Sequence, residues 1–177
     1  AVSAFVRIEL FESGEELIYG VGASLYAGYA LRSVRPEVMS LRYDLPLETM
    51  SVASLSAHRV AQCLAREQGF DEAVRVDRDG VVRSLGEGSV FGFRDGVLVA
   101  PTTLHTATDV AVWEAARAAR MPAVQHPIRL QELSLYDELF AVDHRGLTSI
   151  QKFDAKPLPA IRVERLAEEL ERWVSAQ

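Results

Sequence analysis

The sequence has 177 residues but a single cysteine, Cys63, and only two lysines, Lys152 and Lys156. One cysteine excludes an intrachain disulfide framework. No apolar run approaches the ~20 residues that a membrane-spanning helix needs. The opening residues AVSAFVRIEL lack a basic segment followed by a long apolar one, so they are not a secretory signal. These absences predict a cytoplasmic protein.

Positive charge is also scarce, because the formal net charge is -6 at pH 7. Nucleic acids and anionic membranes are bound through basic surfaces, so neither is an expected partner. Hydrophobic residues make up 49% of the chain and charged residues 25%, as in ordinary globular proteins. A chain of this length is expected to bury roughly 70% of its unfolded surface and to fold without disulfide bonds or structural metal ions.

Apolar periodicity and turn residues predict strands and helices in succession along the chain. Helices are expected at 54–68, 107–120 and 162–175, with a short helical turn at 130–135. This order favours an α+β or mixed α/β fold over a doubly wound sheet. The expected strands cover residues 4–10, 17–29, 38–45, 74–76, 81–83, 89–93, 97–100, 139–142 and 147–153.

Two Asp-Gly pairs divide the central strands into a meander. Asp79-Gly80 and Asp95-Gly96 each stand between apolar segments, and glycine accepts the positive φ that tight hairpin turns require. We therefore expect residues 74–100 to form consecutive antiparallel strands. Thr106 or Thr108 is expected to cap the helix that follows.

Three segments carry a resemblance to a known family. They are GFDEAVRVDRDGVVRSLGEGSVFGFRDGVLVAP at 69–101, IRLQELSLYDELFAVD at 128–143 and FDAKPLP at 153–159. Their order and spacing resemble the C-terminal domain of class IV aminotransferases. These are the fold-type IV pyridoxal-phosphate enzymes, which include branched-chain and D-amino-acid aminotransferases and aminodeoxychorismate lyases. The resemblance implies a D-amino-acid aminotransferase-like fold, with 51–177 as the C-terminal domain and 1–50 as a remnant of the N-terminal domain and the crossover strands.

Two positions that should serve pyridoxal phosphate in this family carry other residues. Counting back from Asp77 by the family's usual separation places the Schiff-base lysine at Ser51, and a serine cannot form an imine. The acid that should keep the pyridine nitrogen protonated falls at Ser84, with Glu87 three residues further on. The resemblance implies pyridoxal phosphate as the family cofactor, whereas these residues predict that this chain uses none.

The family's phosphate-binding turns are matched only loosely. Thr106 and Thr108 offer hydroxyl and backbone N–H groups at the start of the second helix, where helix N-termini bind phosphate. Asp109 brings a negative charge to the same place, and like charges repel. Arg145, in the turn Asp143-His144-Arg145-Gly146, is either a further anion ligand or an ordinary residue of a surface turn.

The remaining polar residues leave room for a reaction without a cofactor. His105, Asp143 and His144 fall in loops that border the cofactor cavity in the family, so they are candidate general acid and base groups, together with Glu87. The four histidines form no H-x-x-x-H pair and do not cluster with Cys63, so no metal site is expected.

Three functional hypotheses follow from these residues. The first is a degenerate class IV aminotransferase-like or aminodeoxychorismate-lyase-like protein, a pseudoenzyme that binds a small metabolite or a partner without normal pyridoxal-phosphate chemistry. The second is an enzyme of the same fold with cofactor-independent acid/base chemistry. The third is an active pyridoxal-phosphate-dependent aminotransferase or aminodeoxychorismate lyase whose lysine lies elsewhere than Ser51. We also expect a homodimer in which residues 1–50 contribute heavily, because bare strand edges and apolar faces need cover.

Overall fold

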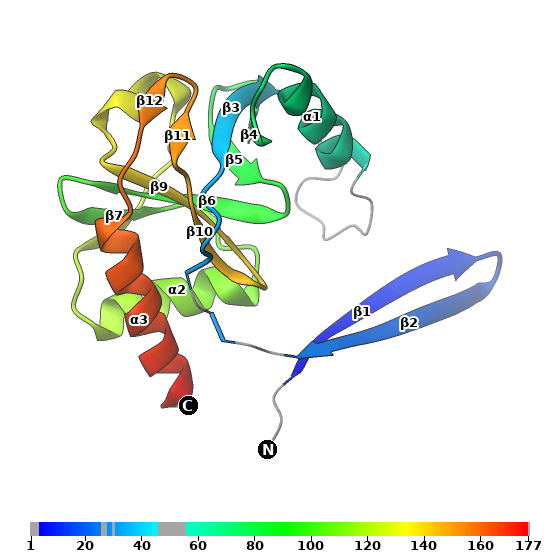
Figure 1. Cartoon of the computed structure of the whole chain (residues 1–177). Helices are drawn as coiled ribbons and strands as arrows, with labels where there is room; N and C mark the ends of the chain where they lie inside the picture. The colour runs from blue at the N-terminus through cyan, green and yellow to red at the C-terminus, as the bar shows by residue number, and fades with distance from the viewer. Residues whose placement is uncertain (1–3, 26–27, 30, 46–55, 177) are drawn as a thin grey trace.

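The computed structural model describes residues 4–25, 28–29, 31–45 and 56–176. Strands β1 (Ala4–Ser13) and β2 (Glu16–Leu25) form an antiparallel hairpin that extends away from the remainder of the chain (Figure 1). The other strands of the described residues form a second, ten-stranded sheet, and the buried hydrophobic core lies on both of its faces.

The large sheet mixes antiparallel and parallel pairs. Its order is β10-β9-β6-β5-β4-β3-β11-β12, with β7 beside β6 and β8 beside β7. Strands β4 to β7 are consecutive and antiparallel, as the meander predicted, whereas β3 pairs in parallel with β4 and β11, and β7 with β8. The strands are β3 (Glu37–Arg42), β4 (Glu72–Val76), β5 (Val82–Leu85), β6 (Gly88–Arg94), β7 (Val97–Ala100), β8 (Ala123–Gln125), β9 (Glu138–Asp143), β10 (Gly146–Ser149), β11 (Lys152–Phe153) and β12 (Lys156–Pro157).

Both predicted Asp-Gly turns are present. In the β4–β5 turn, Gly80 has a φ of +77°, and the buried Asp77 carboxylate accepts the backbone N–H of Val81 at 2.8 Å and the Arg83 Nε at 2.7 Å. Burial alone raises the pKa of Asp77, but these hydrogen bonds outweigh it and hold the pKa below its ordinary value. In the β6–β7 turn, Asp95 and Gly96 both have positive φ, as a tight hairpin requires.

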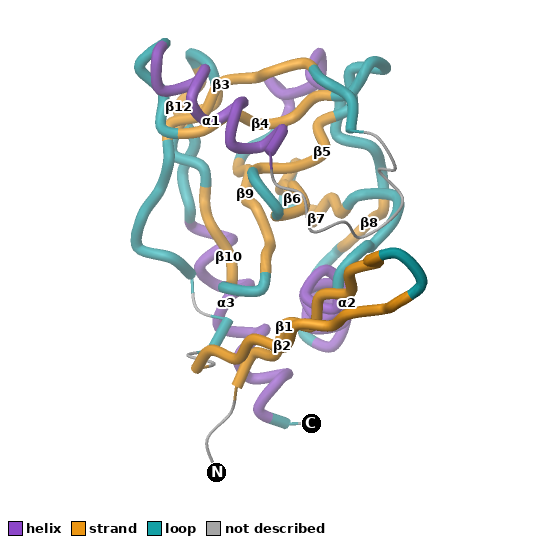
Figure 2. The backbone as a smooth tube through the Cα atoms, turned by 90° about the vertical axis from the view of Figure 1, so that its right-hand side faces the viewer, coloured by secondary structure: helices purple, strands orange, loops and turns teal. Residues whose placement is uncertain are grey.

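Helices cover one face of the sheet at two separate places. Helix α1 (Ser56–Glu67) packs on β3 and β4, whereas α2 (Ala107–Ala118) and α3 (Ile161–Ser175) pack together near β9. Figure 2 shows α1 at one end of the molecule and α2 and α3 towards the other. The opposite face is covered in part by the short 3₁₀ helix η1 (Leu130–Leu135), whose Leu130 and Leu133 pack on it.

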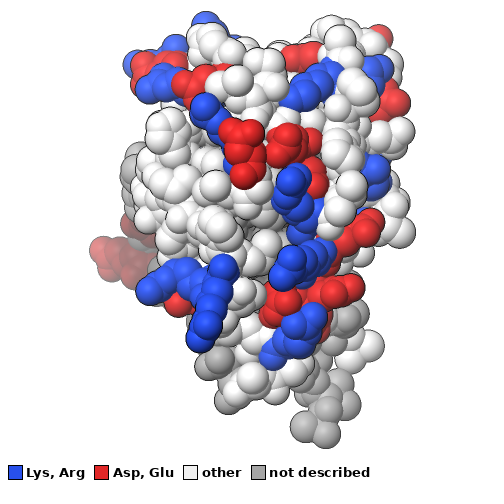
Figure 3. Space-filling view, turned by 90° about the vertical axis from the view of Figure 1, so that its left-hand side faces the viewer, with Lys and Arg blue, Asp and Glu red and all other residues white. Residues whose placement is uncertain are grey.

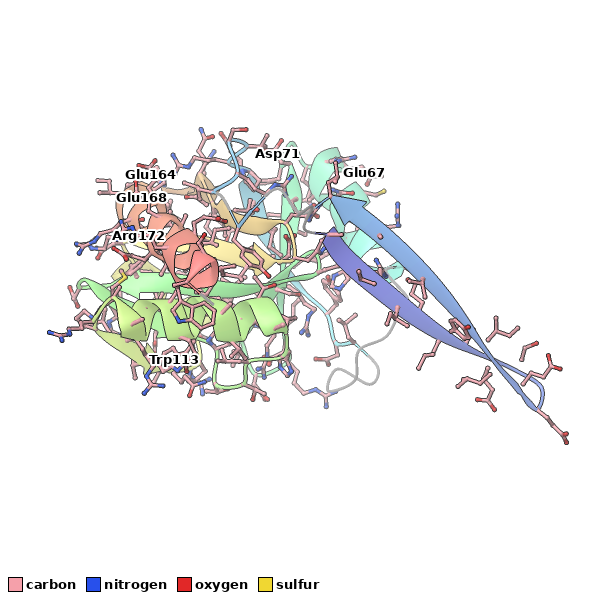
Figure 4. The ribbon with its side chains drawn as sticks, turned by 90° about the horizontal axis from the view of Figure 1, so that it is seen from below. Glu67, Asp71, Trp113, Glu164, Glu168 and Arg172 are labelled. Atoms are coloured by element: carbon pink, nitrogen blue, oxygen red, sulfur yellow. The ribbon has the colours of Figure 1, made fainter. Side chains whose placement is uncertain are left out.

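The core between α2, α3 and the sheet is aromatic at its centre. Phe91 stacks on Phe140 with ring centroids 5.7 Å apart, and Phe93 also stacks on Phe140, with centroids 5.9 Å apart. Trp113 of α2 packs against this core, while Glu164, Glu168 and Arg172 lie on the outward side of α3 (Figure 4). On the face shown in Figure 3, positive and negative side chains lie intermixed.

A buried carboxylate from the sheet caps helix α3. Glu138 of β9 is fully buried, and its oxygens accept the backbone N–H of Arg162 at 2.8 and 3.0 Å and that of Val163 at 3.0 Å. The first N–H groups of a helix have no partner within it, and a negative charge there also interacts favourably with the positive end of the helix dipole. Because the helix has no side-chain cap of its own, Glu138 joins the sheet to α3.

The structure departs from the predicted elements in a few places. Gly28 and Tyr29 lie outside β2, and the strand expected at 147–153 is divided into β10 and β11. Strands β8 and β12 were not predicted. The domain boundary expected at residue 50 falls outside the described residues, while β3 lies in the middle of the large sheet.

Candidate functional site

Two serines face each other at the centre of the sheet. Ser84 of β5 and Ser89 of β6 are direct partners in the antiparallel β5–β6 pair, and Arg75 of β4 is the partner of Ser84 on its other side. Directly paired residues share one face of a sheet, with Cβ atoms roughly 5 Å apart. On that face, Ala73 lies under α1 and Phe91 under α2. The half-buried serines therefore lie between the two places where helices cover the sheet.

A buried guanidinium stands behind Ser84. Arg75 is 4% exposed, and its Nε donates to the Ser84 Oγ at 3.4 Å. Arginine keeps its charge at every physiological pH. The Ser84 hydroxyl is therefore held beside a fixed positive charge.

A buried carboxylate stands behind Ser89. Asp109 is fully buried, and its Oδ2 accepts the Ser89 hydroxyl at 2.9 Å and the backbone N–H groups of His105 and Thr106, both at 3.0 Å. Thr106 is the N-cap of α2, as predicted, and its hydroxyl accepts the Asp109 N–H at 3.0 Å in a complete capping box. Within the described residues, the Asp109 Oδ1 is buried without a hydrogen-bond partner. The N-terminal end of α2 thus already holds an anion of its own.

The two serines therefore lie between charges of opposite sign. On one side Ser84 accepts a hydrogen bond from a buried guanidinium, and on the other Ser89 donates to a buried carboxylate. This pair of hydroxyls, each bound to a charged side chain, forms a polar patch on the sheet. It offers hydrogen bonds to a polar ligand rather than a nucleophile with an adjacent base.

A tyrosine and a histidine belong to the same surroundings. The Tyr43 hydroxyl lies 3.1 Å from the His58 Nδ1, and the rings meet edge to face. Burial lowers the pKa of His58, and the charge of Arg75 lowers it further. Burial also raises the pKa of Tyr43. Near neutral pH the pair is therefore a neutral imidazole beside a protonated phenol.

The lowered pKa of His58 makes the stability of the fold depend on pH. Just below pH 6.5 the imidazole of the unfolded chain is protonated, whereas that of the folded protein is still neutral. Its contribution to the free energy of unfolding is complete above that value and is lost as the pH falls below it. We expect the free energy of unfolding, measured in urea, to differ less between about pH 5.5 and about pH 7.5 in His58→Gln than in the parent. His126→Gln, at an exposed histidine, serves as the control, and an equal pH dependence in both variants would contradict this prediction.

The residues predicted for the site are distributed around this serine pair. Glu87 is exposed in the β5–β6 turn, and Thr108 is buried in the first turn of α2. His105 is exposed just before α2, where its N–H donates to Asp109. His144 is half-buried in the β9–β10 turn. The position predicted for the family lysine, Ser51, lies outside the described residues.

Asp143 and Arg145 bind each other. The Asp143 carboxylate accepts the Arg145 backbone N–H at 2.7 Å and its Nε at 3.0 Å, and it also contacts the Nη2. The turn lies close to the serine pair, because Val142, next to Asp143, is the β9 partner of Ser89. Asp143 and Arg145 thus form an ion pair with each other.

Sequence reasoning missed Arg75, Tyr43 and His58. The arginine between the two valines of β4 is the one signal that could have directed attention to Arg75. The described part of the chain contains no group of three or more His, Cys, Asp or Glu side chains that could hold a metal ion. None of its helices has the length and apolar character that crossing a bilayer requires.

Several solved structures of other proteins share this architecture. No family model and no curated protein matches the sequence. Among solved structures, a hypothetical aminotransferase from Mycobacterium tuberculosis in its apo form is similar with a TM-score of 0.81 at 20% identity, over 98% of this chain and 69% of that one. The branched-chain aminotransferase from Thermoproteus uzoniensis is similar with a TM-score of 0.77 at 23% identity, over 96% of this chain and 64% of that one.

A third structure extends the comparison to a cofactor-bound protein. An aminotransferase from Brucella abortus bound to pyridoxal phosphate is similar with a TM-score of 0.81 at 18% identity, over 99% of this chain and 69% of that one. The chain therefore has the fold of the fold-type IV aminotransferases and aminodeoxychorismate lyases. It spans between 64% and 69% of the length of these three proteins.

The residues at the positions that the family pattern assigns to pyridoxal phosphate do not suit that cofactor. A protonated pyridine nitrogen needs an acid, but the family pattern puts Ser84 at that position, and a buried guanidinium donates to its hydroxyl. The phosphate dianion needs a positive helix end, but the Asp109 carboxylate already occupies donors at the start of α2. At both ends the charge has the sign opposite to the one that the cofactor requires.

Neither lysine offers a free amine for an imine. Lys152 forms an ion pair with Glu37, with 3.1 Å between the Nζ and the Oε2. The Lys156 Nζ donates to the carbonyl oxygens of Leu133 at 3.0 Å and Ser134 at 3.1 Å, and also to that of Tyr136. A lysine engaged in such contacts must break them before its amine can attack a carbonyl group.

Proposed function

We propose that this protein is a degenerate fold-type IV protein, a pseudoenzyme that binds a small polar metabolite at Ser84 and Ser89 without pyridoxal-phosphate chemistry. The observation that carries the proposal is the reversal of charge at the two ends of the serine pair, with Arg75 on one side and Asp109 on the other. The proposal places the protein in the cytoplasm, without a nucleic-acid or membrane partner.

The residues retained from the family pattern support this proposal because they serve the fold. Asp77 closes the β4–β5 turn, Gly80 supplies its positive φ, and Glu138 caps α3. The positions that differ, Ser51 and Ser84, are those that would serve the cofactor. A chain that keeps structural residues while its catalytic positions change is expected when binding remains and catalysis does not.

The proposal is tested by an NMR titration of the protein with small amino, hydroxy and keto acids. We expect saturable shifts at the amides of Ser84 and Ser89 for one of these classes, and a loss of those shifts in Ser84→Ala and Ser89→Ala. The exposed Ser175→Ala is the matched control. Covalent uptake of pyridoxal phosphate by the parent protein would refute the proposal.

A second candidate function is cofactor-independent acid/base chemistry on the same face. The neutral His58 beside the protonated Tyr43 favours it, because a general base must be unprotonated at the working pH. Exchange of a substrate's α-proton in D₂O, followed by NMR, distinguishes the two functions. Exchange that His58→Gln abolishes would establish catalysis, whereas binding without exchange supports the first proposal.

The hairpin leads us to propose a homodimer. One of its faces is apolar except for Glu12 near the turn, and Ile8, Leu10, Tyr19 and Val21 on that face are between 60% and 71% exposed. We expect sedimentation velocity to show a dimer at micromolar concentration. Ile8→Glu should weaken it by at least about tenfold, since burying one such side chain is worth roughly 1.5–3 kcal/mol. Arg7→Gln, on the other face, should leave it unchanged, and a monomeric parent would contradict the proposal.

A further inference from the structure

A pocket of about 270 Å³ lies at the far end of β6 from the serine pair. Ser89 is near the start of that strand, whereas the pocket is lined by Arg94 at its end and by Asp95 in the turn that follows. The pocket is therefore separate from the site described above. Its size is just below the 300–1,000 Å³ typical of drug-sized ligands, roughly right for a smaller one.

The floor of the pocket is made of valines. Val97 and Val99 come from β7, and Val124 of β8 is the direct partner of Val99 in the parallel β7–β8 pair. Val99 is buried, but Val124 remains 44% exposed. An aliphatic group placed on these side chains would remove apolar surface from water, which is favourable.

A buried tyrosine with an uncommitted hydroxyl forms one wall. Tyr136 is 1% exposed and lines the pocket, and its hydroxyl makes no hydrogen bond to any described residue. Gly92 makes room for its ring, because a Cβ at that position would lie 2.7 Å from the Tyr136 Cδ1. Burial raises the pKa of Tyr136, so the phenol stays protonated and can donate. The hydroxyl is not one of the fully buried polar atoms without a partner among the described residues, so it is reached from the pocket and can donate to a ligand there.

A free guanidinium stands at the same pocket. Arg94 is half-buried and forms no ion pair within the described residues. The charges of Glu132 and Arg94 both act on Tyr136: Glu132 adds to the effect of burial and raises the pKa, and Arg94 lowers it. Asp95 and His126 also line the pocket, but both are exposed and solvated at its rim. The pocket thus combines an apolar floor with two donors, one of them charged.

We propose that this pocket binds a small aliphatic carboxylate. The carboxylate accepts hydrogen bonds from the Arg94 guanidinium and the Tyr136 hydroxyl, and the aliphatic chain lies on Val97, Val99 and Val124. Arginine matches the planar geometry of a carboxylate and holds it in a fixed orientation. The inference goes beyond the proposed function, since neither Ser84 nor Ser89 contributes to it.

The experiment is an amide NMR titration with 3-methylbutanoate and with its neutral analogue 3-methylbutanamide. A ligand this small is expected to bind with a Kd on the order of millimolar. We expect saturable shifts at Val97, Val99 and Val124, and at least about tenfold weaker binding of the amide. Arg94→Gln should weaken binding of the acid by about tenfold or more, and Tyr136→Phe several-fold, as the loss of a charged and a neutral hydrogen bond implies.

The control is Arg59→Gln, which removes an exposed arginine of α1 and should leave binding unchanged. The absence of saturable shifts at the three valines would overturn the proposal, as would equal affinities of Arg94→Gln and Arg59→Gln. Shifts confined to the amides of Ser84 and Ser89 would also overturn it, and would instead support the proposed function.

Discussion

A variant that carries Ser51→Lys together with Ser84→Glu should gain visible absorbance when pyridoxal phosphate is added, while the parent protein stays colourless. The lysine supplies the amine for an imine, and the glutamate supplies a charge partner for the pyridine nitrogen. A hydrogen bond to a charged group is worth roughly 1.5–3 kcal/mol. The glutamate should therefore strengthen cofactor binding by about tenfold to a hundredfold relative to Ser51→Lys alone.

The single variants separate the two contributions. Ser84→Glu alone should remain colourless, because it has no amine at the required position. Ser51→Lys alone should take up the cofactor weakly, because Ser84, beside the Arg75 guanidinium, offers the pyridine nitrogen no acid. A double variant that is folded by circular dichroism yet colourless would show that Ser51 is not at the position of the family lysine.

Glu138→Ala should lower the free energy of unfolding by about 3–5 kcal/mol, the largest effect that we expect from a single substitution. The substitution leaves the backbone N–H groups of Arg162 and Val163 buried at the start of α3 without their acceptor. It also leaves a cavity between the sheet and the helix. Urea unfolding followed by circular dichroism measures the effect.

Two further variants identify its cause. Glu138→Gln keeps the shape and one carbonyl acceptor, so it should lose less than Glu138→Ala. Glu168→Ala, on the outward side of α3 (Figure 4), removes a 72% exposed side chain and should change stability by less than about 0.5 kcal/mol. Equal losses in Glu138→Ala and Glu168→Ala would contradict the capping role.

The sequence predicted those parts of the fold that depend on local interactions. The Asp-Gly turns depend on positive φ at one or two residues, and the start of α2 depends on the spacing of Thr106 and Asp109. Helix α3 follows a strict apolar period, and its buried residues include Leu166 and Leu170. Each of these patterns is complete within a few residues, so it can be read without knowledge of the tertiary structure.

Long-range pairing could not be predicted in the same way. Lys152 and Phe153 pair with Glu37 and Val38 across more than a hundred positions, and nothing in either segment specifies the other. Strands β8 and β12 have three and two residues, too few to show a period. Their strand conformation comes from their neighbours in the sheet.

The candidate site was predicted only where the family pattern marked it. That pattern indicated Ser84, and the first turn of α2 indicated Asp109. Ser84 accepts a hydrogen bond from the buried Arg75. The burial of Arg75 depends on which face of β4 it occupies. The contact between Tyr43 and His58 depends in turn on how α1 lies against β3. The electrostatic properties of the site therefore depend on tertiary packing, which the sequence alone does not show.

The central claim is that this fold-type IV chain does not form an imine with pyridoxal phosphate. The most direct measurement is the intact mass of the parent protein after incubation with the cofactor and reduction with borohydride. We predict an unchanged mass and no visible absorbance, because Ser51 is not an amine and the Nζ groups of both lysines are engaged in other contacts. An added phosphopyridoxyl group, mapped by peptide digestion to Lys152 or Lys156, would contradict the account.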